Sequence, residues 1–474
     1  MNFMKYSTLQ LKIKKGWADL KTIRIGAGQG FYGDSFDGAV LNAKYGKLDY
    51  LSFDALAELT MAILSKNKLR DDNLGYTRDI HLAMKALLPY VKEQRFKMLT
   101  NAGGLNPHAA KEVVLNVAKD LGFTDLKVAV VTGDDIKPDI KQLQIEGVDF
   151  TDIQTGQPFT EEIEQKLLFA NAYLGAEPLV EALRQGADIV ISGRTTDTAQ
   201  FLAPLIYEFD WSYDDWDKLA SGIFMGHLLE CSAQSTGGNF SGDWEDIEGF
   251  DHIGYPLAEF NENGEFVITK VEESGGLVNE QTIKEQMLYE IHDPAAYITP
   301  DVIMDVTNVT LEKVGQNRVK ITGVKGKPRP DELKVVAGYE DGYLGQVIVG
   351  YSWPHALEKA KKAEEIIYQM IEKKGISYDK VHVDYVGYNS LHGPLAHEPE
   401  DPNEIYLRMV VKTDHKGKAD NFFRLFPPLA LNGPPTMSLL GNIPSRQQLG
   451  MWSFIIPRQL VEDNVSISIS EVES

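Results

Sequence analysis

Short apolar runs alternate with helix-patterned segments from residue 22 onward, and this alternation limits the fold more than any other feature. Apolar runs of strand length occupy residues 22–25, 49–53, 96–100, 126–132 and 187–192. Helical patterns occupy residues 36–44, 55–65, 78–92, 109–121 and 178–185. Strands separated by helices need crossover connections and therefore run parallel. Most of the runs do not alternate with polar residues, which is typical of strands covered on both faces. The pattern predicts an α/β fold with an open, largely parallel sheet and helices on both faces.

The pattern of apolar and polar residues changes after about residue 300. Strand patterns with turn signals between them occupy residues 306–314, 318–325, 333–339 and 345–351. A charged amphipathic helix pattern follows at 355–374, then strand patterns at 381–386 and 405–412 and a helix pattern at 418–425. This succession predicts an α+β domain with an antiparallel sheet. We therefore expect an N-terminal extension (1–21), an α/β domain (22–300) and an α+β domain (301–474).

The charge balance limits the partners that the chain can bind. Lys and Arg total 47 against 69 Asp and Glu, a formal net charge of −22. Binding to nucleic acid or to an anionic membrane through overall charge is therefore disfavoured. Any anionic ligand must meet local donors. The single cysteine, Cys231, excludes an intramolecular disulfide and cysteine-based metal sites. With no apolar run of about 20 residues and no signal-peptide pattern, we expect a cytoplasmic location.

Glycine-rich polar loops follow the expected strands directly, at the edge where parallel sheets bind ligands. The first contains Gly28, Gln29 and Gly30 and matches G-x-G-x-x-G, with Asp54 about 20 residues further on, as in dinucleotide sites. Phe31 and Tyr32 are bulky for such a tight loop, so a simple strand-to-helix turn is the alternative. Each of the later loops can also be a compact turn. The other expected substrate-binding residues lie in four such loops: Asn101, Gly103, Gly104 and Asn106; Gly193, Arg194, Thr195 and Asp197; Thr236, Gly237 and Gly238; and Gly275 and Gly276.

A polar stripe near residue 230 is the main candidate for catalysis. On a helix, His227, Glu230, Cys231 and Gln234 share one face. A histidine, a carboxylate and a thiol together supply a base, its orienter and a nucleophile. A structural His–Glu pair and a buried, inert cysteine are the alternatives.

Carboxylates are a second candidate set. Asp54 is the fourth expected catalytic residue and shares a helix face with Glu58, although it also suits a helix N-cap. With Asp34, Asp134 and Asp135, these carboxylates can also hold a divalent cation through oxygen ligands, so the metal question stays open.

Several motifs resemble the acyclic terpene utilisation (AtuA) family, and they recur in the same order over most of the chain: IRIGAGQGFYGDS, LDYLSFDALAELTMAIL, TNAGGLNP, ADIVISGRTTDTA and HLLECSAQSTGG. The resemblance implies a cytosolic catabolic protein that handles a branched acyl-CoA or a related organic acid. It also implies a lyase or hydratase step. It supplies no catalytic residues, so the candidate residues rest on the patterns above.

We therefore expect an enzyme that acts on an acyl-CoA or organic acid by acid–base chemistry, with a small-molecule substrate and a homo-oligomeric state. No cofactor is firmly implied; CoA would enter as part of the substrate, and a divalent metal is compatible with the sequence. Three alternatives stay open. They are an NAD(P)-dependent oxidoreductase that uses the first glycine loop, a non-catalytic subunit of a catabolic complex, and a metal hydrolase.

Overall fold

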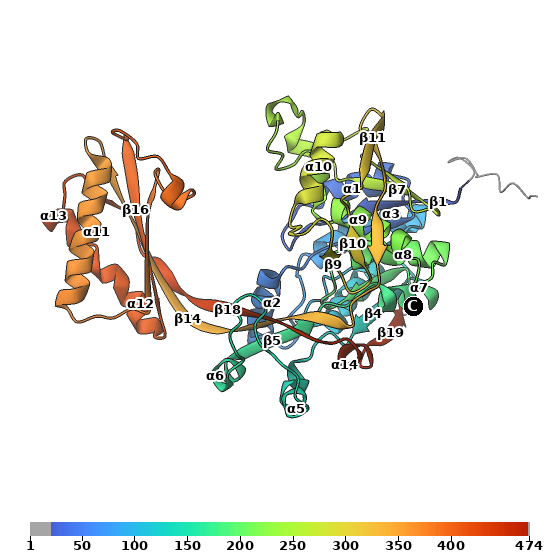
Figure 1. Cartoon of the computed structure of the whole chain (residues 1–474), viewed down its shortest axis with the longest axis horizontal. Helices are drawn as coiled ribbons and strands as arrows, with labels where there is room; N and C mark the ends of the chain where they lie inside the picture. Colours follow the sequence, from blue (N-terminus) through green and yellow to red (C-terminus); the bar gives the residue numbers. More distant parts are fainter. Residues whose placement is uncertain (1–19, 473–474) are drawn as a thin grey trace, which may run out of the picture. The chain divides into compact units, whose positions relative to one another are not determined.

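The computed structural model describes residues 20–472, so nearly all of the expected N-terminal extension (1–21) lies outside the described residues. Contacts within the chain form two compact units (Figure 1). The first unit holds the described residues up to 159, residues 169–337 and those from 453 onward. The second holds residues 160–168 and 338–452. The expected domain division at residue 300 stays a prediction.

A ten-stranded mixed sheet forms the centre of the first unit. In spatial order its strands are β11 (Thr310–Gly315), β12 (Arg318–Thr322), β8 (Phe266–Thr269), β7 (Leu257–Asn261), β1 (Thr22–Ala27), β2 (Tyr50–Phe53), β3 (Lys97–Thr100), β6 (Ile189–Ser192), β4 (Lys127–Thr132) and β19 (Ser466–Glu471). The five strands from β1 to β4 in this order are parallel. The flanking pairs are antiparallel. The expected α/β class and largely parallel sheet are confirmed.

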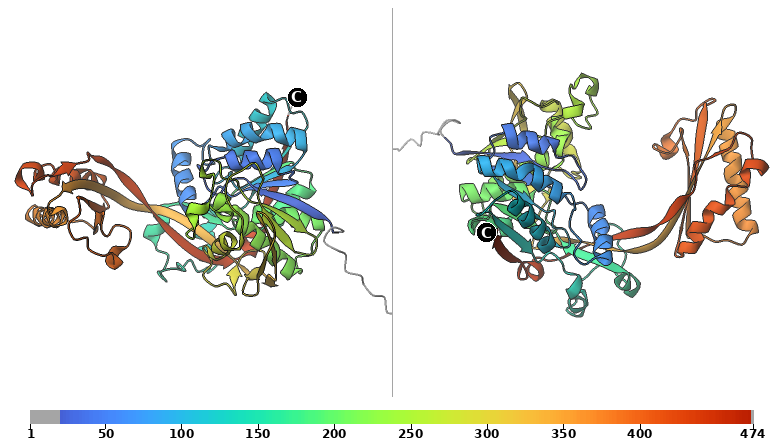
Figure 2. Two further views of the ribbon diagram at one scale, coloured as in Figure 1. Left: turned by 90° about the horizontal axis from the view of Figure 1, so that it is seen from above. Right: turned by 180° about the vertical axis from the view of Figure 1, so that it is seen from behind.

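Helices cover both faces of the parallel strands (Figure 2). The first face carries α1 (Asp37–Tyr45), α3 (Ile80–Gln94) and α4 (Pro107–Asp120). The second carries α7 (Glu177–Arg184), α8 (Ala199–Phe209) and α9 (Trp216–Glu230). This double cover explains the uninterrupted apolar runs, since β2 and β6 are buried at every position.

The remaining elements of the first unit lie around this sheet. A three-stranded sheet packs against α9 and contains β13 (Lys325–Lys327), β10 (Ile303–Asp305) and β9 (Tyr297–Ile298). The other helices are α2 (Glu58–Arg70), α5 (Ile140–Ile145), α10 (Glu280–Leu288) and α14 (Gln459–Glu462). None of the helices between residues 20 and 472 is long and apolar enough to cross a bilayer.

The second unit is built on an antiparallel sheet, as expected for the C-terminal part of the chain. Its strand order is β15 (Lys380–Val386), β16 (Glu404–Thr413), β14 (Glu332–Ser352) and β17 (Ser438–Leu439), and β5 (Leu167–Ala172) and β18 (Ile443–Pro457) also pair with β14. Helix α11 (Ala356–Lys373) runs along β16 (Figure 1). The short helices are α6 (Glu161–Gln165), α12 (Lys416–Phe422) and α13 (Leu429–Asn432). Apolar residues of α11, β14 and β16 form its core.

Three local expectations are wrong. The patterns at 333–339 and 345–351 form the single strand β14, because the Asp341–Gly342 turn signal is absorbed within the strand, with Gly342 at φ 78°. Asp54 does not cap α2, which begins at Glu58 after Ala57. Helix α9 ends at Glu230, and residues 232–236 form a separate 3₁₀ turn, so the polar stripe does not continue along one helix.

Candidate active site

A cavity of about 870 Å³ lies at the carboxyl ends of the parallel strands. Gly30, Asp54 and Arg194 of its wall follow β1, β2 and β6, respectively. Glu230 and Cys231 enter from the C-terminal end of α9. Residues 289–300 and 330–334 contribute further wall residues. The cavity, which we call the first cavity, therefore occupies the position where open parallel sheets bind ligands.

Arg194 is fixed in the wall of the first cavity. Its side chain is 2% exposed, and its Nη1 donates to the Leu56 carbonyl and to Asp197 Oδ1, both at 2.9 Å. Its guanidinium stacks 4.1 Å from the centroid of the Tyr173 ring. Arg194 and Asp197 therefore form an ion pair, and the same guanidinium also lines the cavity.

A second cation and a carboxylate surround Tyr173. The Tyr173 hydroxyl donates to Glu58, and Lys334 Nζ lies 3.3 Å from Glu58 Oε1. Burial alone would raise the pKa of Glu58, but the charge of Arg194 and the Tyr173 hydroxyl lower it to about 2. Glu58 is therefore held ionised between two cations.

Asp54 lies deeper in the wall, in a different electrostatic state. Asn101 Nδ2 donates to Asp54 Oδ1 at 2.5 Å, and Asn101 Oδ1 accepts the Ala55 N–H at 2.7 Å. Burial raises the pKa of Asp54 well above its usual range, and the nearby charge of Asp197 adds to the shift. Arg194 and the Asn101 hydrogen bond act in the opposite direction.

Glu230 and His227 form a buried pair behind the wall. His227 Nδ1 lies 2.9 Å from Glu230 Oε1, and His227 Nε2 lies 2.8 Å from the Gln286 carbonyl. A carbonyl accepts, so Nε2 carries the hydrogen, and in a neutral ring Nδ1 must accept from Glu230. Burial raises the pKa of Glu230 and lowers that of His227. Both shifts favour a neutral ring beside a protonated carboxyl.

The geometry gives the two members of this pair different positions. Glu230 lines the first cavity, and its Oε2 is buried without a hydrogen-bond partner in residues 20–472. Both nitrogens of His227 are engaged. Of the two, Glu230 is therefore the one placed to exchange a proton with a ligand, and His227 is placed to hold it.

Cys231 lines the cavity next to Glu230. Burial raises the pKa of its thiol, and the neighbouring carboxyl groups of Glu230 and Asp54 raise it further. The thiolate is the reactive form of cysteine. Cys231 is therefore a neutral thiol at physiological pH. The groups that shift its pKa include no cation that would activate it as a nucleophile.

The comparison with known protein families agrees with the motif pattern. The family model of the acyclic terpene utilisation family protein AtuA matches residues 23–467. The chain belongs to the AtuA family. The match spans both compact units and includes every residue of the cavity wall named above. A search of curated proteins found no match.

In this AtuA-family chain, packing against neighbouring atoms explains most of the expected glycines. A Cβ at Gly103 would lie 2.5 Å from the Ser192 carbonyl oxygen, and one at Gly193 would lie 2.4 Å from Asp134 Oδ1. Close contacts of the same kind surround Gly28, Gly104, Gly237, Gly238, Gly275 and Gly276. Gly30 packs on Ser232 and also lines the cavity. The glycine loops therefore let the backbone segments approach one another closely.

The first glycine loop has its own carboxylate partners. The Gly30 N–H donates to Asp34 at 3.0 Å. The Gly33 N–H and Gln29 Nε2 both donate to Asp79 Oδ2 at 2.9 Å. The amides that would meet a pyrophosphate in a dinucleotide site thus already hold side-chain anions.

The other polar candidates make structural contacts. Asn106 caps α4 through the Ala109 N–H, Thr195 accepts from Gln200, and Thr236 donates to the Gly254 carbonyl. Among the described residues, no group of three or more His, Cys, Asp or Glu side chains is arranged to hold a metal ion.

Sequence reasoning missed several residues of the wall, among them Tyr173, Lys334, Glu290 and Tyr297. Tyr173 directly follows β5, which is not among the expected strands, so the rule that polar residues follow strands did not reach it. Lys334, Glu290 and Tyr297 lie in segments without a glycine or helix-start signal. Only the fold brings these residues to the cavity.

Asp134 supports the Arg194 loop from behind, and it gives a prediction about pH. Its Oδ2 accepts the Arg194 N–H at 2.8 Å and Asn171 Nδ2 at 2.7 Å. Burial raises its pKa to about 6. The folded state therefore binds the Asp134 proton more tightly than the unfolded state does. The stabilisation of the fold by the protonated Asp134 carboxyl is complete below pH ~4 and is lost as the pH rises through about 6.

We expect Asp134→Asn to remove this dependence. Between pH 4 and pH 7 the wild type should lose about 2 kcal/mol of unfolding free energy relative to the variant. The amide oxygen introduced at position 134 can take the place of Oδ2 and accept both the Arg194 N–H and Asn171 Nδ2. Urea unfolding at four pH values measures the difference. Burial also raises the pKa of Asp301 to about 6, but both proteins contain Asp301, so its contribution to the pH dependence cancels. Parallel stability curves would contradict the prediction.

Proposed function

We propose that the chain is an enzyme of the lyase or hydratase class that acts on a branched acyl-CoA or a related organic acid. AtuA family membership suggests a role in acyclic terpene catabolism. One observation carries the assignment of acid–base chemistry. Glu230, a buried carboxyl held by His227, has a raised pKa and lines a cavity that also contains Arg194. Buried carboxyls with raised pKa values in a cavity are typical proton donors.

Two carboxyls divide the proton transfer in this proposal. Asp54 is the base: burial raises its pKa well above the usual range, so its carboxylate takes up a proton readily, while the charge of Arg194 and the hydrogen bond from Asn101 oppose that shift. Glu230 is the acid. In a dehydration, Asp54 takes the proton from carbon, the carbon–oxygen bond breaks, and Glu230 gives its proton to the departing hydroxyl, which leaves as water. In a carbon–carbon cleavage, Asp54 takes a hydroxyl proton and Glu230 protonates the carbon that is released.

The cations of the wall bind the acid group of the substrate. Arg194 and Lys334 both lie beside Tyr173, and their donors can stabilise a carboxylate or the oxyanion that develops on a thioester. The chain's net charge of −22 by itself repels an anionic substrate. The positive charges of Arg194 and Lys334 offset this repulsion locally. The cytoplasmic location and the homo-oligomeric state stay predictions.

A deuterium-exchange screen tests the proposal without knowledge of the reaction direction. The full-length protein is incubated in D₂O with branched acyl-CoAs and short hydroxy acids, and each compound is followed by mass spectrometry. We expect deuterium incorporation, or a mass change equal to one water or to a lost fragment, in at least one compound at catalytic enzyme concentrations. Folded wild-type protein that changes none of these compounds would contradict the proposal.

A further inference from the structure

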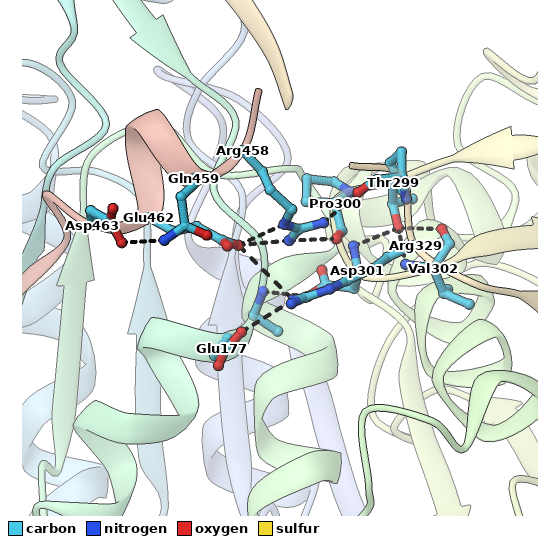
Figure 3. Close-up of polar contacts among 12 residues, drawn as sticks. Glu177, Thr299, Pro300, Asp301, Val302, Arg329, Arg458, Gln459, Glu462 and Asp463 are labelled. Carbon is cyan, nitrogen blue, oxygen red and sulfur yellow. Dashed lines mark hydrogen bonds and ion pairs between the residues drawn. The ribbon is translucent and has the colours of Figure 1, made fainter. Parts of the chain in front are cut away.

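A second cavity, of about 320 Å³, lies between α7, Asp301 and α14. Figure 3 shows its ionic cluster, in which Arg458 donates to Glu462 at 2.6 Å and to the Pro300 carbonyl at 3.2 Å. Arg329 donates to Glu177 at 3.2 Å. These residues all belong to the first compact unit. Two carboxylates of the wall are therefore already matched by two guanidinium groups.

Asp301 is a third carboxylate of this wall, and a fourth, Glu181, accepts from Gln185 Nε2 at 3.1 Å. The Asp301 side chain is almost completely buried, with the residue 6% exposed. Its Oδ1 accepts the Ala176 N–H at the start of α7, at 2.9 Å. Its Oδ2 is buried and has no hydrogen-bond partner anywhere in the described chain. A buried acceptor without a partner costs free energy, and a bound donor would satisfy it.

Tyr213 provides a second unsatisfied group in the same wall. Its hydroxyl is also buried without a partner among the residues that the structure describes. Burial raises the pKa of Tyr213, the charges of Glu177 and Asp301 raise it further, and those of Arg184 and Arg329 lower it. Tyr213, Asp301, Arg184 and Arg329 all line this cavity.

Arg184 is the cation of this wall with the weakest internal partner. Its ion pair joins Nη2 to Asp210 Oδ1 over 3.8 Å, and the Asp210 side chain is 96% exposed. Such a surface pair contributes little stability. Arg184 can therefore turn its guanidinium to a carboxylate in the cavity at small cost.

We infer that the second cavity binds a small carboxylate that also carries a hydrogen-bond donor, either a hydroxyl or an ammonium group. The carboxylate meets Arg184 and Arg329, the donor meets Asp301 Oδ2, and the Tyr213 hydroxyl bonds to either group. The ligand occupies a site separate from the first cavity. Thr299 and Pro300 line the first cavity, Asp301 lines the second, and Leu333 lines both.

Calorimetric titration of the full-length protein with four matched probes tests this inference. 3-Hydroxybutyrate and serine carry both groups, butyrate lacks the donor, and ethanolamine lacks the carboxylate. We expect 3-hydroxybutyrate or serine to bind with one site per chain, and butyrate and ethanolamine to bind at least about tenfold more weakly. Serine carries an ammonium group in addition to a hydroxyl, so tighter binding of serine than of 3-hydroxybutyrate indicates an ammonium donor.

Three variants locate the binding. Asp301→Asn removes the acceptor charge and Tyr213→Phe removes the hydroxyl, and each should weaken binding at least about tenfold. Tyr213→Phe keeps the ring, so it serves if Asp301→Asn fails to fold. Glu230→Gln in the first cavity should leave the affinity unchanged. The inference is overturned if neither donor-bearing probe binds at millimolar concentration, if binding survives both substitutions, or if Glu230→Gln removes it. No turnover is measured, so a failure here leaves the proposed reaction untouched.

Discussion

Replacement of Glu230 by Gln should lower the rate of proton transfer about 10²–10⁴-fold and leave the chain folded. A glutamine amide has no acidic proton to give to a leaving group. It can still donate an N–H to His227 Nδ1, which lies 2.9 Å from the present carboxyl oxygen. The buried pair therefore keeps its hydrogen bond while it loses its acid. Product formation followed by mass spectrometry measures the rate, and thermal unfolding followed by circular dichroism checks the fold.

Two further variants separate acid chemistry from general effects of charge. Glu332→Gln removes a carboxylate from the exposed rim of the same cavity and should change the rate less than about threefold. His227→Gln removes the ring that contacts the Glu230 carboxyl, so it should shift the alkaline limb of the pH–rate profile, where the acid loses its proton, as well as lower the rate. Equal losses in Glu230→Gln and Glu332→Gln, or a near-normal rate in Glu230→Gln, would remove Glu230 from its proposed role.

The parallel part of the fold was predictable because its signals are local. Strands β1, β2, β3, β4 and β6 are short, largely buried apolar runs, and helix α4 begins at a polar residue and a proline, Asn106 and Pro107. The long strand β14 was not predictable in the same way. Asp341 and Gly342 resemble a turn, and only pairing with partners distant in the chain keeps this segment extended.

The candidate site was predictable where a strand end supplied a residue, and less so elsewhere. Asp54 and Arg194 follow β2 and β6, so the topology alone brings them to one edge. Glu230 was identified from a helical stripe that does not continue past residue 230. Lys334 comes from the start of β14, far along the chain. Its contact with Glu58 depends on how the whole first unit packs, and no local pattern encodes that contact.

Replacement of Arg194 by Met should destabilise the protein by about 3–5 kcal/mol, because it leaves buried partners without a counter-charge. The guanidinium now hydrogen-bonds to Leu56 and Asp197 and holds the pKa of Glu58 at about 2. Glu58 has a depressed pKa, so its stabilising contribution is present above its ordinary pKa and is lost as the pH falls toward about 2. The deficit of the variant should therefore be largest near pH 7 and shrink below about pH 4.5.

Urea unfolding at pH 7 and pH 4 measures this deficit, and Arg318→Met is the matched control. Arg318 also makes a bidentate pair, with Glu259, but its side chain is 36% exposed. Its loss should cost at most about 1 kcal/mol. Arg194→Lys keeps the charge but loses the planar fork that reaches Leu56 and Asp197 together, so it should recover only part of the deficit. Similar small losses in Arg194→Met and Arg318→Met would mean that the carboxylates around Arg194 relax into water. The wall of the first cavity would then be held by Tyr173 and the strand ends rather than by the buried guanidinium.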